Sequence, residues 1–508
     1  MTSPTVSFTG SSGQRAPLGD LMQRHASLDP DAPALTVDDR SVSRAEFEAR
    51  CNRRARFLAG LGVTQDDLVT VALPNGLEFF ETVFALWKLG ATPNPVSSAL
   101  SDPELSGILE VGRPRLVIGI DPGRAAGFNT LESGTEIPAD MSPDYEPSLV
   151  PRYWKAMTSG GSTGRPKLIV DHMAGTWDPA EGGLAQRPGE TILNPGPLYH
   201  NGPFLASMLG LFSGGHVVEM GHFDPVGVLE QIARRQITWT LLVPTMMHRI
   251  TRLPDAVREA FDLSSLRRVV HSAAPCPVWL KRFWIDWLGP DRILEVYTGT
   301  ERQAVVTISG EDWLAHPGSV GRAPEGSGIR ILDDEGRDLP PGEIGEIFLR
   351  PDAGRNATYH YLGAEARARG EWESLGDLGW TDADGYLFLS DRRKDLIIRG
   401  GANIYPAEVE AALDSHPAVM SSAVIGLPDE DFGEVIHALV QLSPSATASA
   451  AELRAYLKTQ LTYYKVPKTI EFVAEPLRDA AGKVRRSQLR DDRLARVSTG
   501  PAGAVTPR

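Results

Sequence analysis

Eleven consecutive residues, Met157 to Lys167, combine three glycines, four hydroxyl side chains and a lysine. Glycine lets main-chain N–H groups approach an anion closely, while hydroxyl groups and a lysine add hydrogen-bond donors and positive charge. This composition predicts a loop that holds a polyphosphate. Its candidate phosphate-binding residues are Thr158, Ser159, Gly160, Gly161, Ser162, Thr163, Gly164 and Lys167.

Two other interpretations of this loop were compared with phosphate binding. A stretch rich in glycine and serine also suits a flexible linker. The P-loop template fits poorly, because it places Ser or Thr directly after Gly-Lys, whereas Lys167 follows Pro166 and precedes Leu168. This argues against a kinase or GTPase of that type. The apolar residues 168–170 predict a buried strand, which would give the loop a rigid base.

A second group of polar residues follows the apolar run 293–296. Ligand-binding groups gather at the carboxyl ends of strands in open α/β sheets, so the residues after this predicted strand are candidates. Tyr297 would lie against a base and Thr300 on a phosphate. Glu301 would hold the Mg²⁺ that travels with ATP, because this ion prefers oxygen ligands and takes few of them from protein.

Small residues follow another predicted strand, 269–271. The side chains of Ala273, Ala274 and Pro275 suit a place where a flat ring lies against the backbone, and they equally suit tight core packing.

Residues 195–204 are too rich in glycine and proline for a helix, and they contain the neighbouring pair Tyr199 and His200. A histidine beside an aromatic ring is more often a core or surface residue than a functional one. Thr245 and Met246 follow a third predicted strand, where methionine could also belong to the core.

Four polar sites or segments come later in the chain. Asp377 carries a carboxylate that can accept two hydroxyl groups at once, as a ribose diol would offer, although a turn aspartate explains it equally. The charge run 391–395 is typical of a solvated face. The basic loop 480–486 could likewise serve only to solvate its surface. The pattern 382–385 predicts a β-hairpin with an Asp-Gly turn, since a calcium loop would need further ligands.

These motifs, in this order, resemble the acyl-adenylate-forming superfamily of acyl-CoA synthetases, nonribosomal peptide synthetase adenylation domains and luciferases. Its phosphate loop usually reads Thr-Ser-Gly-(Ser/Thr)-Thr-Gly-x-Pro-Lys-Gly, and its second motif Tyr-Gly-x-Thr-Glu. The resemblance extends from the region of Leu68 to Lys483, with at least five motifs in order. It implies ATP, Mg²⁺ and coenzyme A as cofactors and a small carboxylic acid as substrate.

The resemblance implies a role for each candidate residue. Tyr199, His200, Thr245 and Met246 would border the acyl group, and Glu301 would be the metal ligand. Lys483, Glu301, Thr300 and His200 would be catalytic. Adenine and ribose would contact Ala273, Ala274, Pro275, Tyr297, Thr298, Asp377 and Arg392. Gly400 and Gly401 would line the coenzyme A tunnel, and Lys394 would be the hinge.

The implied reaction has two steps. A carboxylate attacks the α-phosphorus of ATP and expels pyrophosphate while Mg²⁺ and Lys483 offset charge on the phosphoryl oxygens. The small domain then turns about Lys394, and the thiol of coenzyme A attacks the acyl-adenylate. No side-chain nucleophile is required.

Three residues depart from the superfamily pattern: Gly160 and Leu168 in the phosphate loop, and Thr298 in place of a glycine. The two loop departures resemble bile-acid and steroid-type CoA ligases. They imply an acid:CoA ligase for a bulky, hydrophobic, polycyclic acid, for example a diterpenoid acid of a platensimycin-type pathway. Because a β-branched residue restricts the backbone, Thr298 motivates an enzyme that only thioesterifies an adenylate made elsewhere. The chain could also load a carrier protein in place of coenzyme A, or bind a nucleotide without catalysis.

Composition limits the partners. The 508 residues carry a net charge of -14, which disfavours nucleic acid. Cys51 and Cys276 provide no disulfide framework, and neither a targeting segment nor a membrane-spanning apolar run is evident. We expect a soluble, cytoplasmic protein without membrane insertion, and a homodimer is left open.

The elements that must position these residues alternate between strand and helix. Ser43 opens a capping box before a helical pattern, and residues 68–73 and 77–89 predict a strand and a helix. The predicted fold class is α/β, with mostly parallel sheets covered by helices in a large N-terminal domain. From Pro406 the pattern predicts a small, mobile α+β domain at the C-terminus.

With the hinge implied by the resemblance, the predicted domains are 1–393 and 394–508. Residues after about 493 are expected to be disordered.

Overall fold

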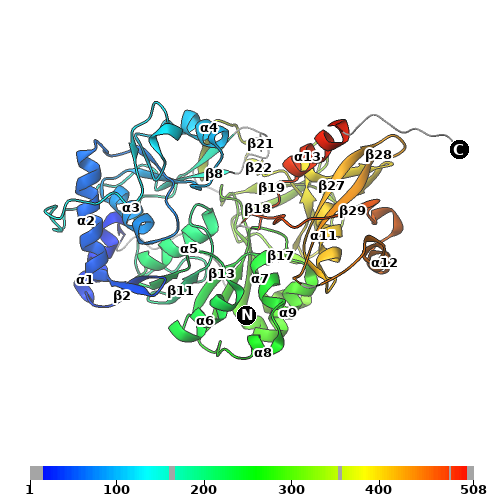
Figure 1. Ribbon diagram of the computed structural model, residues 1–508, viewed down its shortest axis with the longest axis horizontal. Coiled ribbons are helices and arrows are strands. Elements are labelled where there is room, and N and C mark those ends of the chain that lie inside the picture. Colours follow the sequence, from blue (N-terminus) through cyan, green and yellow to red (C-terminus); the bar gives the residue numbers. More distant parts are fainter. Residues whose placement is uncertain (1–14, 160–165, 353–356, 445, 480–481, 500–508) are drawn as a thin grey trace. The chain divides into compact units, whose positions relative to one another are not determined.

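The computed structural model describes residues 15–159, 166–352, 357–444, 446–479 and 482–499 (Figure 1). It divides into two compact units, the first formed by Met1–Ile329 with Phe348–Ser374 and the second by Arg330–Ile347 with Leu375–Arg508. The predicted α/β fold class, with a larger N-terminal and a smaller C-terminal domain, is confirmed. The division at 393/394 with its hinge stays a prediction.

An eight-stranded sheet forms the centre of the first unit, in the order β16-β15-β14-β13-β11-β12-β2-β3. Its neighbours from β15 to β2 are parallel, and only the edge strands β16 and β3 pair antiparallel. The strands are β2 (Pro33–Val37), β3 (Arg40–Ser43), β11 (Thr191–Asn194), β12 (His216–Glu219), β13 (Trp239–Leu242), β14 (Arg268–His271), β15 (Ile293–Tyr297) and β16 (Val306–Ser309).

Two smaller sheets complete the first unit's frame. One is parallel, with β5 (Thr92–Pro95), β4 (Leu68–Val71), β6 (Leu116–Ile118) and β7 (Thr130–Leu131) in that order. The other is antiparallel, with β20 (Tyr359–Leu362), β9 (Lys167–Asp171) and β8 (Lys155–Ser159). The strands β1 (Ala16–Pro17) and β10 (Thr176–Trp177) form a two-stranded sheet. A seven-stranded sheet contains β17 (Ser319–Gly321), β18 (Gly328–Leu332), β19 (Gly345–Arg350), β21 (Arg367–Arg369) and β22 (Trp372–Ser374), and β18 and β19 cross the division between the two units.

Helices pack on these sheets; α5, for example, packs against β11, β12 and β13. The helix predicted after Ser43 is α2, and the Ser43 hydroxyl accepts a hydrogen bond from the Glu46 N–H at 3.2 Å. The helices are α1 (Leu21–Leu28), α2 (Arg44–Gly60), α3 (Leu77–Lys88), α4 (Asp102–Gly112), α5 (Asn201–Phe212), α6 (Pro225–Arg235), α7 (Pro244–Thr251), α8 (Asp255–Arg258), α9 (Val278–Leu288) and α10 (Gly310–Ala315).

The second unit is an α+β unit, as predicted. A five-stranded sheet, β26-β25-β28-β27 with β29 on β28, carries its own buried core. The predicted Asp-Gly hairpin joins β23 and β24, and the Gly385 N–H donates to the Asp382 carbonyl at 3.1 Å. The elements are β23 (Asp377–Thr381), β24 (Leu387–Arg392), β25 (Ile397–Arg399), β26 (Ala402–Ile404), α11 (Pro406–Asp414), β27 (Val419–Asp429), β28 (Gly433–Leu442), α12 (Ala450–Gln460), β29 (Thr469–Phe472) and α13 (Arg486–Thr499).

Two predictions are wrong. A helix was excluded from residues 195–204, yet α5 begins at Asn201 and has Pro203 in its first turn. Proline is tolerated there because the first turn's N–H groups need no helical partner. Residues after about 493 were expected to be disordered, yet α13 continues to Thr499; residues 500–508 lie outside the described part of the chain. Arg493 anchors this helix to Glu471 with N···O distances of 3.0 and 2.8 Å.

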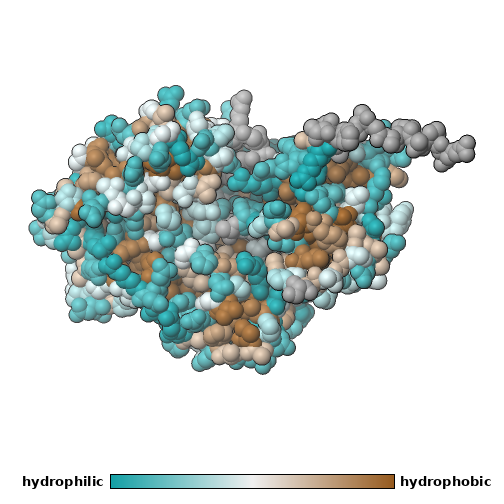
Figure 2. All heavy atoms as spheres, viewed as in Figure 1, coloured by the Kyte–Doolittle hydropathy of each residue, from teal (hydrophilic) through white to brown (hydrophobic). Residues whose placement is uncertain are grey.

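Hydrophilic and hydrophobic residues are interspersed over the face that Figure 2 shows. No helix among the described residues combines the length and the apolar character that crossing a membrane requires.

The core of the first unit centres on aromatic rings that join α3, α5 and the segment before β8. The fully buried Trp87 stacks on Trp154 with ring centroids 6.1 Å apart, and its Nε1 donates to the Trp154 carbonyl at 2.7 Å. Phe84, Phe204 and Phe212 surround the Trp87 ring. This cluster fixes α5, whose first residues follow His200.

Two substitutions of Trp87 should therefore destabilise the first unit to different extents. We expect Trp87→Ala to lower the free energy of unfolding by about 3–5 kcal/mol through the cavity that it leaves. Trp87→Phe keeps most ring contacts and loses the hydrogen bond, so about 1–3 kcal/mol is expected. Denaturant unfolding at one protein concentration measures both. If the two variants had the same free energy of unfolding, the ring contacts of Trp87 would not contribute to stability as expected.

Candidate active site

Four neighbouring parallel strands, β11, β13, β14 and β15, end at the same edge of the central sheet. The segments that follow them contain most of the predicted site residues of the first unit. The acyl candidates follow β11 and β13, and the small-residue turn follows β14. Tyr297 is the last residue of β15, and residues 298–301 follow it. The topology thus brings to one edge segments that are separated by up to about a hundred residues of sequence.

The two acyl candidates after β11 form one aromatic pair. The rings of Tyr199 and His200 lie 4.6 Å apart between centroids, and both side chains are half-buried. His200 directly precedes α5 as its N-cap residue. Met246 is buried in α7 and its neighbour Thr245 is half-buried. Their acyl-binding roles stay predictions.

The turn after β14 stores backbone strain. Ala273 has a φ of 76°, in the left-handed region that favours glycine. The Ser272 hydroxyl secures this turn by donating to the carbonyl of Val296 in β15 at 2.6 Å. Non-glycine residues in this region cost on the order of 1 kcal/mol or more and cluster at ligand sites. The turn therefore suits the nucleotide contact predicted for residues 273–275.

Thr298 turns its side chain back on its own loop. The hydroxyl donates to the Ala304 carbonyl at 2.8 Å and lies 3.2 Å from the Gly299 carbonyl. A glycine at this position would lack that contact, so Thr298 closes the turn that follows β15. The adenine contact predicted for Thr298 and for the half-buried Tyr297 stays a prediction, as does the phosphate contact of Thr300.

The carboxylate of Glu301 lies beside the lysine of the phosphate loop. Tyr361 donates its hydroxyl to the buried Glu301 at 2.6 Å, and Lys167 Nζ lies 3.8 Å from the same oxygen. Lys167 Nζ also lies 3.7 Å from the centre of the Tyr361 ring. Burial, together with the charge of Glu301, raises the pKa of Tyr361, so this hydroxyl stays protonated and donates.

The predicted phosphate loop is the connection of a β-hairpin. Ser159 of β8 pairs with Lys167 of β9, and residues 168–170 are buried, as predicted. Asn94 donates to the half-buried Thr158 hydroxyl at 3.3 Å. Lys167 and Thr158 are thus placed at the hairpin's end, while five predicted loop residues lie outside the described part of the chain, namely Gly160, Gly161, Ser162, Thr163 and Gly164.

The residues present fit a magnesium ion that arrives with a nucleotide. No group of three or more His, Cys, Asp or Glu side chains within the described ranges could hold a metal ion by itself. Mg²⁺ usually keeps several waters and binds through one or two carboxylates plus substrate phosphates. Glu301 offers one carboxylate at the end of the hairpin of the phosphate loop, which matches that donor set.

A buried ionic network that the sequence did not reveal connects three site segments. Asp171 at the end of β9 lies 3.1 Å from Lys155 Nζ and 2.6 Å from Arg302, the residue after Glu301. Lys155 also donates to Asn201, the residue after His200, at 2.6 Å. Asp171 thereby links the β8–β9 hairpin, the segment that contains Glu301 and, through Lys155, the start of α5.

The charges of this network are well paired. Burial lowers the pKa of Lys155, and Asp171 opposes that effect. Although burial alone would raise the pKa of Asp171, Lys155 and Arg302 hold it below its usual value. Arg302 has a φ of 54°, so its ion pair with Asp171 holds a strained backbone next to Glu301. In the sequence, the one feature that could have indicated this network is Lys155, a charged residue inside the otherwise apolar run 154–157.

In the second unit, the two predicted ribose-binding residues contact each other. Asp377 of β23 pairs in register with Arg392 of β24, and the Arg392 Nε lies 3.2 Å from the Asp377 carboxylate. The Asp377 side chain is 14% exposed and the Arg392 side chain is 54% exposed. The pair therefore joins a half-buried carboxylate to a largely solvent-exposed guanidinium group.

The glycine pair and the hinge candidate lie close together in sequence and have local explanations. Gly400 and Gly401 have φ values of 56° and 83° and form the two-residue turn between β25 and β26. A turn of this kind requires positive φ at both positions, so the pair is needed for folding whatever its part in the coenzyme A tunnel. Lys394 is exposed in the 3-10 helix Arg393–Asp395.

The predicted catalytic lysine stands on a tight turn. The Lys483 N–H donates to the Asp479 carboxylate at 2.9 Å, and the Asp479 N–H donates to the Lys483 carbonyl at 3.0 Å. Gly482 has a φ of 74° within this turn. The Lys483 side chain is exposed, which a group that must reach a separate ligand requires.

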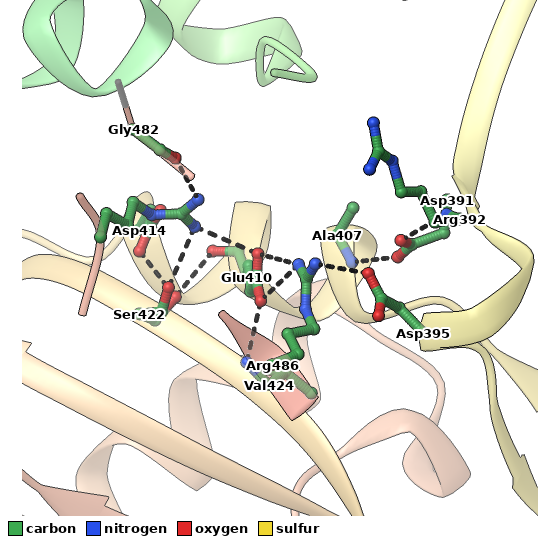
Figure 3. A network of polar contacts seen from close by, with 11 residues as sticks. Asp391, Arg392, Asp395, Ala407, Glu410, Asp414, Ser422, Val424, Gly482 and Arg486 are labelled. Atoms are coloured by element: carbon green, nitrogen blue, oxygen red, sulfur yellow. Dashed lines mark hydrogen bonds and ion pairs between the residues drawn. The ribbon is translucent and has the colours of Figure 1, made fainter. Parts of the chain in front are cut away.

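Beside Arg392, a buried carboxylate caps α11 (Figure 3). Asp391 accepts hydrogen bonds from the N–H groups of Arg392 at 2.7 Å and Ala407 at 2.8 Å. Burial raises the pKa of Asp391 from 3.8 to about 6, although Arg486 favours its charged form; the charge of Glu410 adds to the rise.

Comparison with known proteins identifies the family. Residues 22–359 match the family described as AMP-binding enzyme, and residues 408–483 match the AMP-binding enzyme C-terminal domain. The chain therefore belongs to the AMP-binding enzyme family.

The relatives include named ligases. A feruloyl-CoA synthase of Amycolatopsis sp is 34% identical over 492 residues, covering 93% of this chain and 98% of the relative. The o-succinylbenzoate CoA synthetase from Bacillus subtilis, solved with its acyl-adenylate intermediate, is 28% identical with a TM-score of 0.79 and covers 94% and 99%. Another structure of that synthetase holds ATP and a magnesium ion. An anthranilate CoA ligase with anthranoyl-AMP is 26% identical with a TM-score of 0.81 and covers 96% and 99%.

The buried network around Asp171 predicts a specific effect on nucleotide binding. Lys155→Met leaves Asp171 with one cation fewer and releases Asn201, so a stability loss of about 3–5 kcal/mol and weaker ATP binding are expected. Lys88→Met is the matched control, because Lys88 is also a buried lysine and its Nζ lies 2.7 Å from Glu48. Titration calorimetry with ATP on the folded variants distinguishes them. If Lys155→Met bound ATP with the affinity of the wild type, the buried network around Asp171 would not influence the nucleotide site.

Asp391 predicts a pH dependence of stability. Because its pKa in the folded protein is raised to about 6, the contribution is present below the unfolded value of 3.8 and is lost as pH rises through 6. The full shift is worth about 3 kcal/mol. Unfolding of the wild type and Asp391→Asn should therefore be compared between pH 4 and 7. The wild type should lose stability relative to the variant as pH rises, and parallel pH profiles would refute this.

Proposed function

We propose that the protein is an acid:CoA ligase that uses ATP, Mg²⁺ and coenzyme A to convert a carboxylic acid into its acyl-CoA thioester through an acyl-adenylate. The observation that carries this proposal is the ion pair between Glu301 and Lys167. It lies next to the edge of the central sheet where the acyl-binding and adenine-binding candidates also lie. The names of the relatives, which are CoA ligases of feruloyl, o-succinylbenzoyl and anthraniloyl groups, support it.

In the first half-reaction, a carboxylate oxygen of the acid forms a bond to the α-phosphorus of ATP, and the bond to the bridging oxygen breaks as pyrophosphate leaves. Lys167 and Thr158 bind the departing phosphates. Glu301 holds magnesium, which when bound neutralises part of the phosphate charge. Lys483 donates to the oxygens of the α-phosphate and the carboxylate, where negative charge increases in the transition state.

In the second half-reaction, the thiol sulfur of coenzyme A bonds to the acyl carbon, AMP leaves, and the thiol proton passes to solvent. We propose that residues 394–508 turn about Lys394 between the two steps, which withdraws Lys483 and brings Gly400 and Gly401 to the thiol. Asp377 and Arg392 hold the ribose in both steps. A cytoplasmic location and a homodimer also stay predictions.

For the acid we propose a bulky hydrophobic ring system of the steroid, terpenoid or polycyclic type. The phosphate-loop sequence, which resembles that of steroid-type ligases, motivates this choice, and the half-buried Tyr199–His200 pair offers aromatic surface. The feruloyl and anthraniloyl groups named in two of the relatives also contain a ring, although they are smaller.

Thr298 favours a second candidate function, in which the chain only thioesterifies an adenylate supplied by another enzyme. The bulk of a threonine at a position where the superfamily has glycine would weaken ATP binding. The hydrogen bond of Thr298 to Ala304 works against this idea, because it directs the hydroxyl into the turn. A third candidate keeps the adenylation step and replaces coenzyme A with a carrier protein.

Separate assays of the two half-reactions test the proposal. Steroid, diterpenoid, aryl and long-chain acids are each incubated with ATP and Mg²⁺, and pyrophosphate release is measured. Thioester formation is then measured from a presynthesised adenylate with coenzyme A or a carrier protein. We expect one ring-containing acid to support both steps with coenzyme A. Turnover of the adenylate alone would instead favour the second candidate, and Thr298→Gly should then increase pyrophosphate release.

A further inference from the structure

Two arginines enclose the loop that carries Lys483. Arg478 lies five residues before the lysine and Arg486 lies three residues after it. Both guanidinium groups bind one carboxylate, that of Glu410 on α11. Arg478 donates to Glu410 at 3.1 Å, and Arg486 donates to its two oxygens at 2.8 and 2.9 Å (Figure 3). The loop is thus attached at both ends to a single point.

That point is rigid. Glu410 is 5% exposed and also accepts the Val424 N–H of β27 at 2.8 Å. Its carboxylate position is therefore fixed by a helix and a strand of the five-stranded sheet. Charge-assisted hydrogen bonds of an arginine to a carboxylate are directional, so they fix orientation as well as distance.

The two arginines also reach beyond Glu410. Arg478 donates to the Gly482 carbonyl at 3.3 Å and to the Ser422 carbonyl at 3.0 Å. Arg486 donates to Asp395 at 3.1 Å, and Asp395 is the neighbour of the hinge candidate Lys394. The network therefore runs from the residue before Lys483 to the residue after Lys394, within the second unit.

We propose that Glu410, through Arg478 and Arg486, is a positioning residue that fixes the base of the Lys483 loop during adenylation. The inference rests on the proposed role of Lys483. A lysine side chain has four flexible torsions, so its ammonium group finds a distant target reproducibly only if its backbone is held in place. A displacement of about 1 Å at a reacting group can cost about a hundredfold in rate.

Stability alone does not require this arrangement. Buried ion pairs of this kind can often be replaced by apolar side chains of similar volume without loss of stability. An apolar contact would hold the two ends of the loop together but would not fix their orientation. The carboxylate provides that orientation for both ends at once, and it acts on the step that uses Lys483.

Glu410→Gln tests the proposal, because the amide keeps the shape and one acceptor oxygen but loses the charge that binds both arginines. We expect pyrophosphate release with ATP and acid to fall about tenfold or more, while thioester formation from presynthesised adenylate stays within about twofold of the wild type. Glu471→Gln is the matched control, since Glu471 binds Arg493 at 2.8 and 3.0 Å in the same unit. The control should leave the ratio of the two rates unchanged.

A double-mutant cycle with Lys483→Ala completes the test. If Glu410 acts only by positioning Lys483, Glu410→Gln should have no further effect on pyrophosphate release once the lysine is removed. An equal loss in both half-reactions, or additive effects with Lys483→Ala, would overturn the inference and leave Glu410 a purely structural residue. If the wild type releases no pyrophosphate but converts the adenylate, the proposed ligase function fails and this inference falls with it. Arg478→Gln should reproduce the selective loss, which guards against misfolding of a single variant.

Discussion

The constraint on which the site depends is the parallel order of β11, β13, β14 and β15. Parallel neighbours require a crossover between each pair, so all four strands end at the same edge of the sheet. Every segment that leaves this edge can then contribute side chains to one region, however far apart the segments lie in sequence. The small-residue turn after β14 and the polar turn after β15 are neighbours for this reason, and the Ser272 hydroxyl joins the first turn to β15 by donating to the Val296 carbonyl.

Much of this arrangement could be predicted from the sequence, because the signals were local. The hairpin with its Asp-Gly turn, the cap at Ser43 and the polar residues after β15 each follow from a few neighbouring side chains. The two errors have different causes, one local and one distant in sequence. Pro203 was treated as a helix breaker although a first turn accepts proline. The polar tail after residue 493 looked unstructured because the anchor of Arg493, the carboxylate of Glu471, lies 22 residues away.

The networks that hold the candidate residues in place could not be predicted from one sequence. Asp171 and Arg302 are separated by 131 residues, and Glu410 and Arg486 by 76. Neither pair shows a spacing that marks it, since an aspartate after a strand or a glutamate on a helix is ordinary. Only the folded chain shows that each carboxylate is buried and binds two cationic side chains. Candidate ligand-binding residues are thus easier to identify from sequence than the residues that hold them in place.

The Asp171 network and the Glu410 network both consist of a buried carboxylate between two cationic side chains, but they connect different kinds of segment. Asp171 joins segments of the first unit that would all be stationary while ATP and acid are bound, so a direct chain of charges from Lys155 to Arg302 suits them. In the proposed reaction, the loop of Lys483 has to remain ordered while residues 394–508 turn about Lys394. A two-point attachment to Glu410 meets that need, because the loop then moves as part of α11 and β27 without reordering at each turnover. Burying one carboxylate between two arginines costs desolvation free energy, and the compensation is orientation of a flexible side chain at the moment when charge develops.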